Sequence, residues 1–160
     1  MTIKLLLAAG IAASAFAGAA MAQDAVRAED PASLTAFLFD TGIASKVDVD
    51  SYGDPMVQFR KGDRQYTIFF YNCTDNAACT NVQFYIGYET DGEVGMDVVN
   101  ALNQENRFAS AAIDDEDDVV FTMDVLTGAY GLSREDFGLL LDVFVEAAAE
   151  FEDRVGWVSE

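Results

Sequence analysis

Two segments of alternating apolar and polar residues, RQYTIFFYN (64–72) and TNVQFYIGY (80–88), flank the only two cysteines of the 160-residue chain. Side chains on a strand alternate between two faces, so the pattern predicts two strands joined in a hairpin whose tip holds Cys73 and Cys79. If the cysteines are opposed, residues whose numbers sum to 152 face each other. One face of the hairpin is then entirely apolar and belongs in the core: Tyr66, Ile68 and Phe70 opposite Ile86, Phe84 and Val82.

The other face of this hairpin mixes aromatic and amide side chains. Thr67 and Asn81 lie on it together with the four residues that we take as candidate partner-binding residues: Phe69, Tyr71, Gln83 and Tyr85. Aromatic and amide side chains on a rigid sheet suit contacts with another protein. The alternative is a second, partly covered sheet face with ordinary aromatic cross-strand pairs. The pattern leaves both interpretations open.

The sequence contains no histidine, and this absence limits the roles that the two cysteines can have. A nucleophilic cysteine lacks its usual base, and a zinc site would have to combine two thiolates with carboxylates, a rare set for a structural site. Two cysteines six positions apart are usually paired in an exported chain, and the N-terminal residues described in the next paragraph predict export. We predict a Cys73–Cys79 disulfide, with free thiols as the alternative. Closing so short a loop stabilises a fold by about 2 kcal/mol on the chain-entropy model.

The N-terminal residues have the three parts of a secretory signal peptide. Lys4 is followed by an uncharged run of Leu, Ala, Ile and Phe, and Ala20-Met21-Ala22 precedes polar Gln23. The pattern predicts a signal peptide over residues 1–22, cleaved after Ala22. An uncleaved membrane anchor is the alternative, but the run is rich in Ala and Gly and is only weakly hydrophobic. We expect a flexible lead-in over residues 23–29 and one domain over residues 30–160.

The charge is extreme and excludes one class of partner. Removal of residues 1–22 leaves eight basic and 28 acidic residues, a net charge of −20. Such a surface repels nucleic acid and anionic lipid, and the sequence contains no basic stripe that would override the average. The charge serves solubility, or it attracts a basic partner or cations.

The remaining patterns predict the order helix, four strands, helix, two strands, helix. Asp30 and Pro31 begin the first helix, which stops at Gly42. Strands are expected over residues 45–51, 55–63, 64–72, 80–88, 107–115 and 117–125, and the middle helix over residues 95–108. Ser133 and Asp136 form a capping pair for the last helix. Its inward stripe is Phe137, Leu140, Leu141, Phe144, Ala148, Phe151 and Val155.

No catalytic constellation is present in the sequence. Triads that need histidine are excluded, and no phosphate loop or nucleotide fingerprint appears. Among 28 acidic residues, no particular pair of carboxylates stands out as a glycosidase pair. The acidic run Asp114 to Asp118 offers oxygen ligands for calcium, but its spacing is not that of an EF-hand loop and favours a solvated acidic turn. We therefore predict no enzyme, no metal site and no cofactor.

The order of elements and several short sequence segments resemble the YbjN domain family of bacteria, also called sensory transduction regulators. The resemblance covers about residues 30–156 and rests on an Asn-rich helix running into an Arg-Phe strand (VNALNQENRF), a DDVV strand and the GLSREDF start of the final helix. It implies an α+β fold like that of the type III secretion chaperones, with an antiparallel sheet packed with helices. It also implies a binding or regulatory role without established catalysis. The signal peptide and the cysteines fit exported members, which places this chain in a bacterial envelope, most simply the periplasm.

Two functional hypotheses follow. The first is an exported interaction module that binds a protein partner, or a second copy of itself, through a sheet face. The high negative charge would favour a basic partner and make binding weaken with salt. The second is an envelope protein that binds a small ligand or a cation at the acidic turn or in a pocket between the sheet and the last helix.

Overall fold

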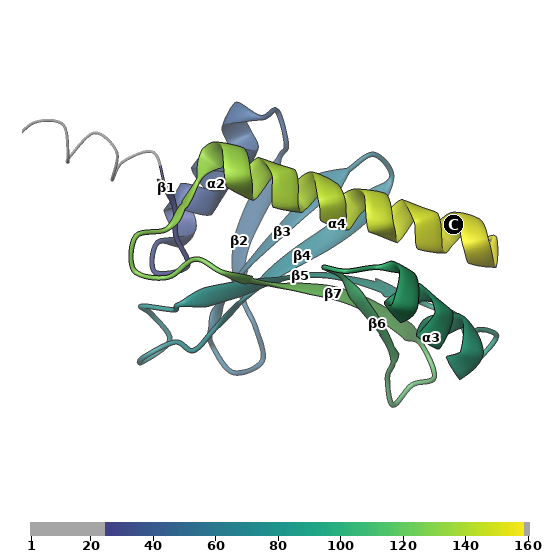
Figure 1. Cartoon of the computed structure of the whole chain (residues 1–160). Coiled ribbons are helices and arrows are strands. Elements are labelled where there is room, and N and C mark those ends of the chain that lie inside the picture. The colour runs from purple at the N-terminus through teal and green to yellow at the C-terminus, as the bar shows by residue number, and fades with distance from the viewer. Residues whose placement is uncertain (1–24, 159–160) are drawn as a thin grey trace, which may run out of the picture.

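The computed structural model describes residues 25–158 (Figure 1). In this region a six-stranded antiparallel sheet in the order β2-β3-β4-β5-β7-β6 packs against three helices, and a two-stranded sheet pairs β1 with β8. The predicted α+β class and the predicted order of the main elements are confirmed. The predicted signal peptide over residues 1–22 lies outside the described residues. None of the described helices is both long and apolar enough to cross a membrane.

The elements have the following bounds. The helices are α2 (Pro31–Asp40), α3 (Met96–Glu105) and α4 (Arg134–Val155). The strands of the large sheet are β2 (Ser45–Val49), β3 (Pro55–Lys61), β4 (Arg64–Tyr71), β5 (Asn81–Tyr88), β6 (Ser110–Ile113) and β7 (Val119–Leu126). The small sheet consists of β1 (Ala25–Val26) and β8 (Leu132–Ser133).

The central hairpin has the predicted register. Ile68 faces Phe84 and Thr67 faces Tyr85 across β4 and β5. The predicted apolar face is buried, with Ile68 and Phe84 fully inaccessible to solvent. The predicted disulfide joins Cys73 to Cys79 at the tip of the hairpin. The alternation of side chains therefore specified both the pairing and the inward face of the two strands.

The residues before the first helix differ from the predicted flexible lead-in. Ala25 and Val26 form β1, and Val26 and Ala28 are fully buried. The amide of Ala28 donates a hydrogen bond of 3.1 Å to the hydroxyl of Thr127. A strand of two residues is too short to show a period, and its partner β8 is distant in the sequence. Residues 25–29 are therefore part of the domain.

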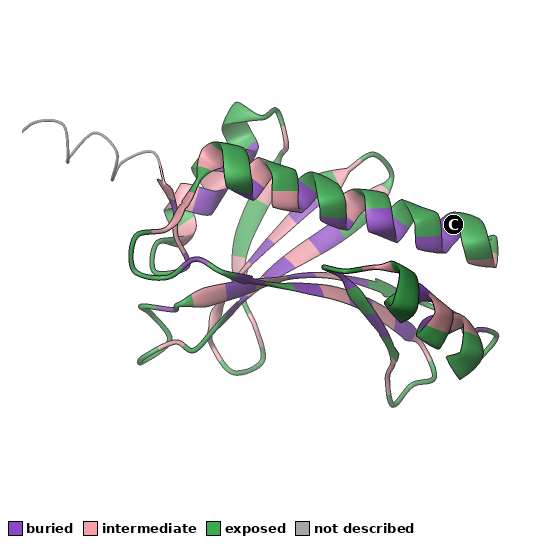
Figure 2. Cartoon of the chain, in the orientation of Figure 1, coloured by how far each residue is buried: buried purple, intermediate pink, exposed green. Residues whose placement is uncertain are grey.

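Among the described helices, α4 contributes the largest number of side chains to the core. The hydroxyl of its N-cap Ser133 accepts the Asp136 amide at 3.0 Å, as the capping pair predicted. A buried stripe faces the sheet along the length of α4, and exposed residues face away from it (Figure 2). Two members of the predicted stripe, Leu140 and Val155, are only partly buried and pack against the edge of the core.

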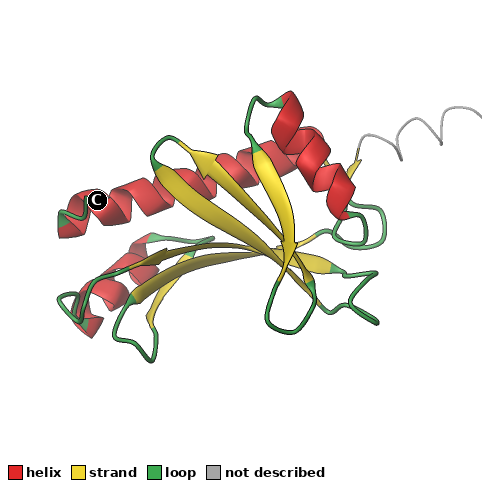
Figure 3. Cartoon of the chain, turned by 180° about the vertical axis from the view of Figure 1, so that it is seen from behind, coloured by secondary structure: helices red, strands yellow, loops and turns green. Residues whose placement is uncertain are grey.

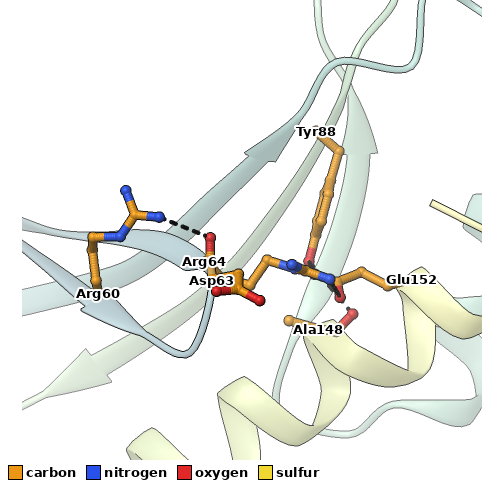
Figure 4. A network of polar contacts seen from close by, with 6 residues as sticks. All are labelled: Arg60, Asp63, Arg64, Tyr88, Ala148 and Glu152. Carbon is orange, nitrogen blue, oxygen red and sulfur yellow. Dashed lines mark hydrogen bonds and ion pairs between the residues drawn. The ribbon is translucent and has the colours of Figure 1, made fainter. Parts of the chain in front are cut away.

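A polar network fixes the C-terminal half of α4 to the sheet (Figure 4). Arg64, the first residue of β4, forms two hydrogen bonds of 2.7 Å with the Glu152 carboxylate through Nε and Nη2. The hydroxyl of Tyr88 donates to the same carboxylate at 3.2 Å. The Arg64 guanidinium also lies 5.0 Å from the centre of the Trp157 ring. Both carboxylate oxygens of Glu152 are thereby engaged in a mostly desolvated position.

The tyrosines near this network give the fold a predictable sensitivity to alkali. Burial raises the pKa of Tyr66 to about 12, and burial together with the Glu152 carboxylate also raises the pKa of Tyr88. In the unfolded chain both groups titrate near pH 10. Above that pH the unfolded chain loses phenolic protons that the folded chain retains, so deprotonation favours unfolding.

We therefore predict that the free energy of unfolding falls between about pH 10 and pH 12, by at most about 1.4 kcal/mol per pH unit for each tyrosine. Urea unfolding at a series of pH values measures this slope. Tyr66→Phe removes one of the groups and should make the decline shallower. A decline of equal steepness in the variant would contradict the assignment to Tyr66.

Candidate functional site

The sheet has one covered and one uncovered face. All three helices contribute buried side chains to the core on the side of Ile68 and Phe84. Over residues 25–158 no helix covers the opposite side (Figure 3). We call that side the open face. Its central side chains are all half-buried or exposed: Met56, Gln58, Thr67, Phe69, Tyr71, Asn81, Gln83, Tyr85, Val120, Thr122 and Asp124.

The structure brings the four predicted partner-binding residues together on the open face. Phe69 and Tyr85 form an edge-to-face pair with ring centres 5.4 Å apart. The hydroxyl of Tyr71 donates a long hydrogen bond of 3.5 Å to Gln83, and the Gln83 amide donates at 2.9 Å to Asp124 of β7. Tyr71 is 41% exposed, and the other three are half-buried. The open face is therefore an ordered aromatic surface in contact with solvent.

Gly87 shapes this surface, although the sequence analysis did not single it out. A Cβ atom at Gly87 would lie 2.9 Å from the hydroxyl oxygen of Tyr85 and 3.5 Å from the ring carbon that carries it. The absence of a side chain thus lets the Tyr85 ring extend along β5 over the glycine backbone. A side chain at this position would force the ring to move. A glycine two positions after an aromatic residue on one strand face is the sequence signal that would have identified it.

An acidic hollow adjoins Tyr85. It has a volume of about 370 Å³, and its lining includes Tyr85, Gly87 and the carboxylates of Asp114, Glu116 and Asp118. Burial raises the pKa of the Tyr85 hydroxyl, and the charges of Asp114, Asp118 and Glu116 raise it further. The phenol therefore stays protonated at neutral pH and presents a hydrogen-bond donor beside negative charge.

The acidic turn between β6 and β7 is held by its own carboxylates. Asp114 accepts the backbone amides of Glu116 and Asp118, each at 3.0 Å. Asp118 accepts the amides of Thr90 and Asp91 at 2.7 and 3.0 Å. Within residues 25–158 no group of three or more aspartate, glutamate or cysteine side chains is arranged to hold a metal ion. These contacts are those of a turn that uses its carboxylates as internal caps.

A comparison with protein families shows which family the chain belongs to. The model of the YbjN family, described as "Putative bacterial sensory transduction regulator", matches residues 30–157. The chain belongs to the YbjN family. The match spans every described element except β1, and it confirms the resemblance that the sequence patterns indicated. No curated protein sequence matches the chain significantly.

A second and larger hollow of this YbjN domain lies between the end of β5, α3 and the end of α4. Its volume is about 800 Å³, and its lining includes Glu89, Glu93, Arg154 and Trp157. Arg154 is ion-paired with Glu105 of α3 across one side of the hollow. None of the four predicted partner-binding residues lines it.

Proposed function

We propose that this YbjN domain is an exported, non-enzymatic regulatory module that binds a basic segment of a protein partner on its open face. The observation that carries the proposal is the Phe69–Tyr85 pair, half-buried at the centre of a sheet face that no described helix covers. The family description, a sensory transduction regulator, supports a regulatory role. The secretion chaperone-like fold that the family resemblance implies supports the binding of a polypeptide segment.

The aromatic pair supplies the apolar part of such a contact. Aromatic rings held on a rigid sheet lose little conformational entropy on binding, because their neighbours already fix them. Thr67 and Gln83 add hydrogen-bonding groups beside the rings, so the surface combines apolar area with polar atoms that give orientation. A partner segment with an apolar or aromatic anchor flanked by polar residues fits this composition.

The rim of the open face indicates the charge of the partner. Asp124 lies beside Gln83, and Asp114, Glu116 and Asp118 border the hollow next to Tyr85. The basic residues Lys46 and Arg60 lie on the same face but toward the β2 edge, so the charge beside Tyr85 is negative. Negative charge next to an aromatic centre favours a ligand of the opposite sign and increases its association rate. A segment that carries lysine or arginine on either side of its anchor is the complementary partner, and its affinity should fall as the salt concentration rises.

The second candidate, an envelope protein that binds a small ligand or a cation, would use the hollow near Trp157 or the acidic turn. Carboxylates within the turn already accept backbone amides, and the one basic residue in the lining of the hollow is paired. The open face, in contrast, presents aromatic side chains whose outer surfaces contact solvent. This difference favours the interaction module.

A single substitution at the aromatic centre should abolish partner binding. We expect Tyr85→Asp to eliminate capture of the partner from the bacterial envelope, because it removes half of the aromatic pair and places a carboxylate where the apolar anchor of the segment would pack. The measurement is affinity capture of the tagged mature chain after crosslinking, with mass spectrometry of the retained proteins.

Leu139→Asp provides the matched control. Leu139 is 60% exposed on the outer surface of α4, so the variant gains the same charge on the opposite side of the molecule. It should retain the partner at the wild-type level. Equal retention by both variants would show that the open face takes no part in binding.

A further inference from the structure

The two edges of the large sheet differ in whether a helix side chain hydrogen-bonds the outward backbone groups of the edge strand. At the β6 edge, the Asn103 side chain of α3 accepts the Ala111 amide at 2.7 Å and donates to the Ala111 carbonyl at 3.0 Å. This side chain occupies the backbone groups that another strand would use. The backbone of β2, the other end of the sheet order, receives no such side-chain cap from the described helices, although α2 packs beside β2. One edge is therefore capped and the other is available for pairing.

The register of β2 shows which of its backbone groups point outward. The Asp50 amide donates to the Asp54 carbonyl at 2.9 Å, and Asp50 and Asp54 continue the register of β2 and β3. Hydrogen-bonded pairs alternate along an antiparallel ladder. Asp48 and Lys46 therefore direct their backbone groups at β3. The amides and carbonyls that point away from the sheet are those of Ser45, Val47 and Val49. The Val49 amide donates a hydrogen bond of 3.0 Å to Asp48 Oδ1 of its own strand, and a paired strand would replace this contact.

The sequence of β2, Ser-Lys-Val-Asp-Val, is complementary to itself. In an antiparallel pair of two β2 strands centred on Val47, Lys46 of each copy faces Asp48 of the other, and Ser45 faces Val49. Within one copy, Lys46 is ion-paired with Asp48 on the same side of its own strand. The two copies would exchange these partners and form two ion pairs across the new ladder. Because Val47 points its backbone groups outward, the central pair is a hydrogen-bonded one.

The other side of β2 supplies apolar surface at the same edge. Val47 is 51% exposed and Val49 is 58% exposed. A hollow of about 510 Å³ lies beside the start of β2, and it is lined by Phe39, Ile43, Ser45 and other residues of α2 and the following loop. Phe39 is 79% exposed. In the centred pairing, Val49 of the second copy is opposite Ser45 and therefore next to this hollow, which provides it with an apolar position.

We propose that β2 is a dimerisation edge whose occupant is a second copy of this chain, so that two six-stranded sheets join into one continuous antiparallel sheet. The order of charges about Val47 favours a second copy over a foreign strand, because Lys46 and Asp48 of each copy meet their opposites in the other. The outward backbone groups of β2 and the hollow beside Ser45 allow a strand to pair at this edge. The proposal does not depend on the partner at the open face, because the open face lies on the broad surface of the sheet and β2 lies at its edge.

The salt dependence of this association is opposite to that of the proposed partner binding. Each mature copy carries a net charge of −20, so two copies repel one another over long distances. Added salt screens this repulsion, while the short pairs of Lys46 with Asp48 are screened less. Dimerisation should therefore strengthen as salt is added, whereas binding of a basic segment should weaken.

A charge exchange within β2 tests the proposal. Sedimentation equilibrium of the mature chain should show a dimer, and Lys46→Asp should raise the dimer Kd about tenfold or more, because an aspartate then faces Asp48 twice in each dimer. Asp48→Lys should do the same with two facing lysines. The double variant Lys46→Asp, Asp48→Lys restores opposite charges at both positions and should return the Kd to near the wild-type value. Circular dichroism confirms that each variant is folded.

The result that overturns the proposal is equally definite. A wild-type chain that stays monomeric up to about 1 mM has no dimerisation edge of useful affinity. A double variant that dimerises no better than the two single variants would place the dimer contact elsewhere or leave β2 to a foreign strand. Thiol crosslinking adds a direct readout: Val47→Cys should be joined to itself across the dimer by a short bifunctional maleimide, and Leu139→Cys on the outside of α4 should not.

Discussion

Phe84→Asp will unfold the domain at 25 °C, whereas Tyr85→Asp, one residue further along β5, will leave it folded. Phe84 is fully buried, and its ring lies 5.4 Å from that of Phe137 and 5.5 Å from that of Phe144. The substitution removes the packing of the ring, which lowers the free energy of unfolding by about 3–5 kcal/mol for a large aromatic residue. It also buries a carboxylate without a charged partner. The sum approaches or exceeds the total stability of a small domain, about 5–15 kcal/mol.

Tyr85→Asp has a much smaller expected effect, because its side chain lies on the open face. The substitution removes the edge-to-face contact with Phe69 and some half-buried area, and the new carboxylate reaches water. We expect a loss of about 1–2 kcal/mol and a retained cooperative transition. Thermal unfolding followed by circular dichroism measures both variants. Ile68→Asp and Phe69→Asp repeat the comparison on β4 with the same expected outcomes. Equal unfolding by all four would show that the open face is buried in solution.

Glu152→Ala should lower the free energy of unfolding by about 3–5 kcal/mol. The substitution removes the acceptor of two 2.7 Å hydrogen bonds from Arg64 and of one 3.2 Å hydrogen bond from Tyr88. The side chains of Arg64 and Glu152 are only 22% and 10% exposed, so water replaces these contacts poorly. The Arg64 guanidinium would then keep its charge in a partly desolvated position without its carboxylate, which is the costly part of breaking a buried pair.

The ion pair between Lys61 and Asp142 offers a control for this prediction. It joins β3 to the same helix at 2.7 Å, but the Lys61 and Asp142 side chains are 37% and 61% exposed. Asp142→Ala should leave the unfolding midpoint near the wild-type value, because exposed pairs contribute little. Urea unfolding of the two variants separates the cases. Similar midpoints for Glu152→Ala and Asp142→Ala would mean that the network in Figure 4 does not anchor α4 to the sheet.

Short-range patterns were sufficient for the hairpin and for the N-terminal caps of the first and last helices, whereas the middle helix, expected over residues 95–108, ends at Glu105. The alternation along β4 and β5 has a period of two, and a shift by one residue would place Ile68 and Phe84 in solvent, so only one register satisfies the pattern. The caps at Asp30 and Ser133 act over two or three residues, and for that reason they can be identified from local sequence. The grouping of Phe69, Tyr71, Gln83 and Tyr85 follows from the same register.

Contacts between residues that are far apart in the sequence could not be predicted from the sequence patterns. The pairing of β1 with β8 and the bond between Arg64 and Glu152 each join residues that are far apart in the sequence. Neither has a periodic signal, because each depends on how the layers are placed in space. The same reason applies to Asn103. Its contact with β6 could not be predicted, because its side chain resembles many other polar side chains on helix surfaces. The exposure of the open face likewise depends on which side of the sheet the helices occupy.

The most direct test of the open face as a binding surface is site-specific photocrosslinking in living cells. A photoreactive amino acid at position 67, opposite Tyr85 on the open face, is compared with one at position 139 on the outside of α4. We predict that position 67 captures a protein through a segment rich in lysine or arginine, that Tyr85→Asp in the same chain abolishes this capture, and that position 139 does not yield the product. Capture of the same proteins from both positions, or of no protein from position 67, would contradict the account.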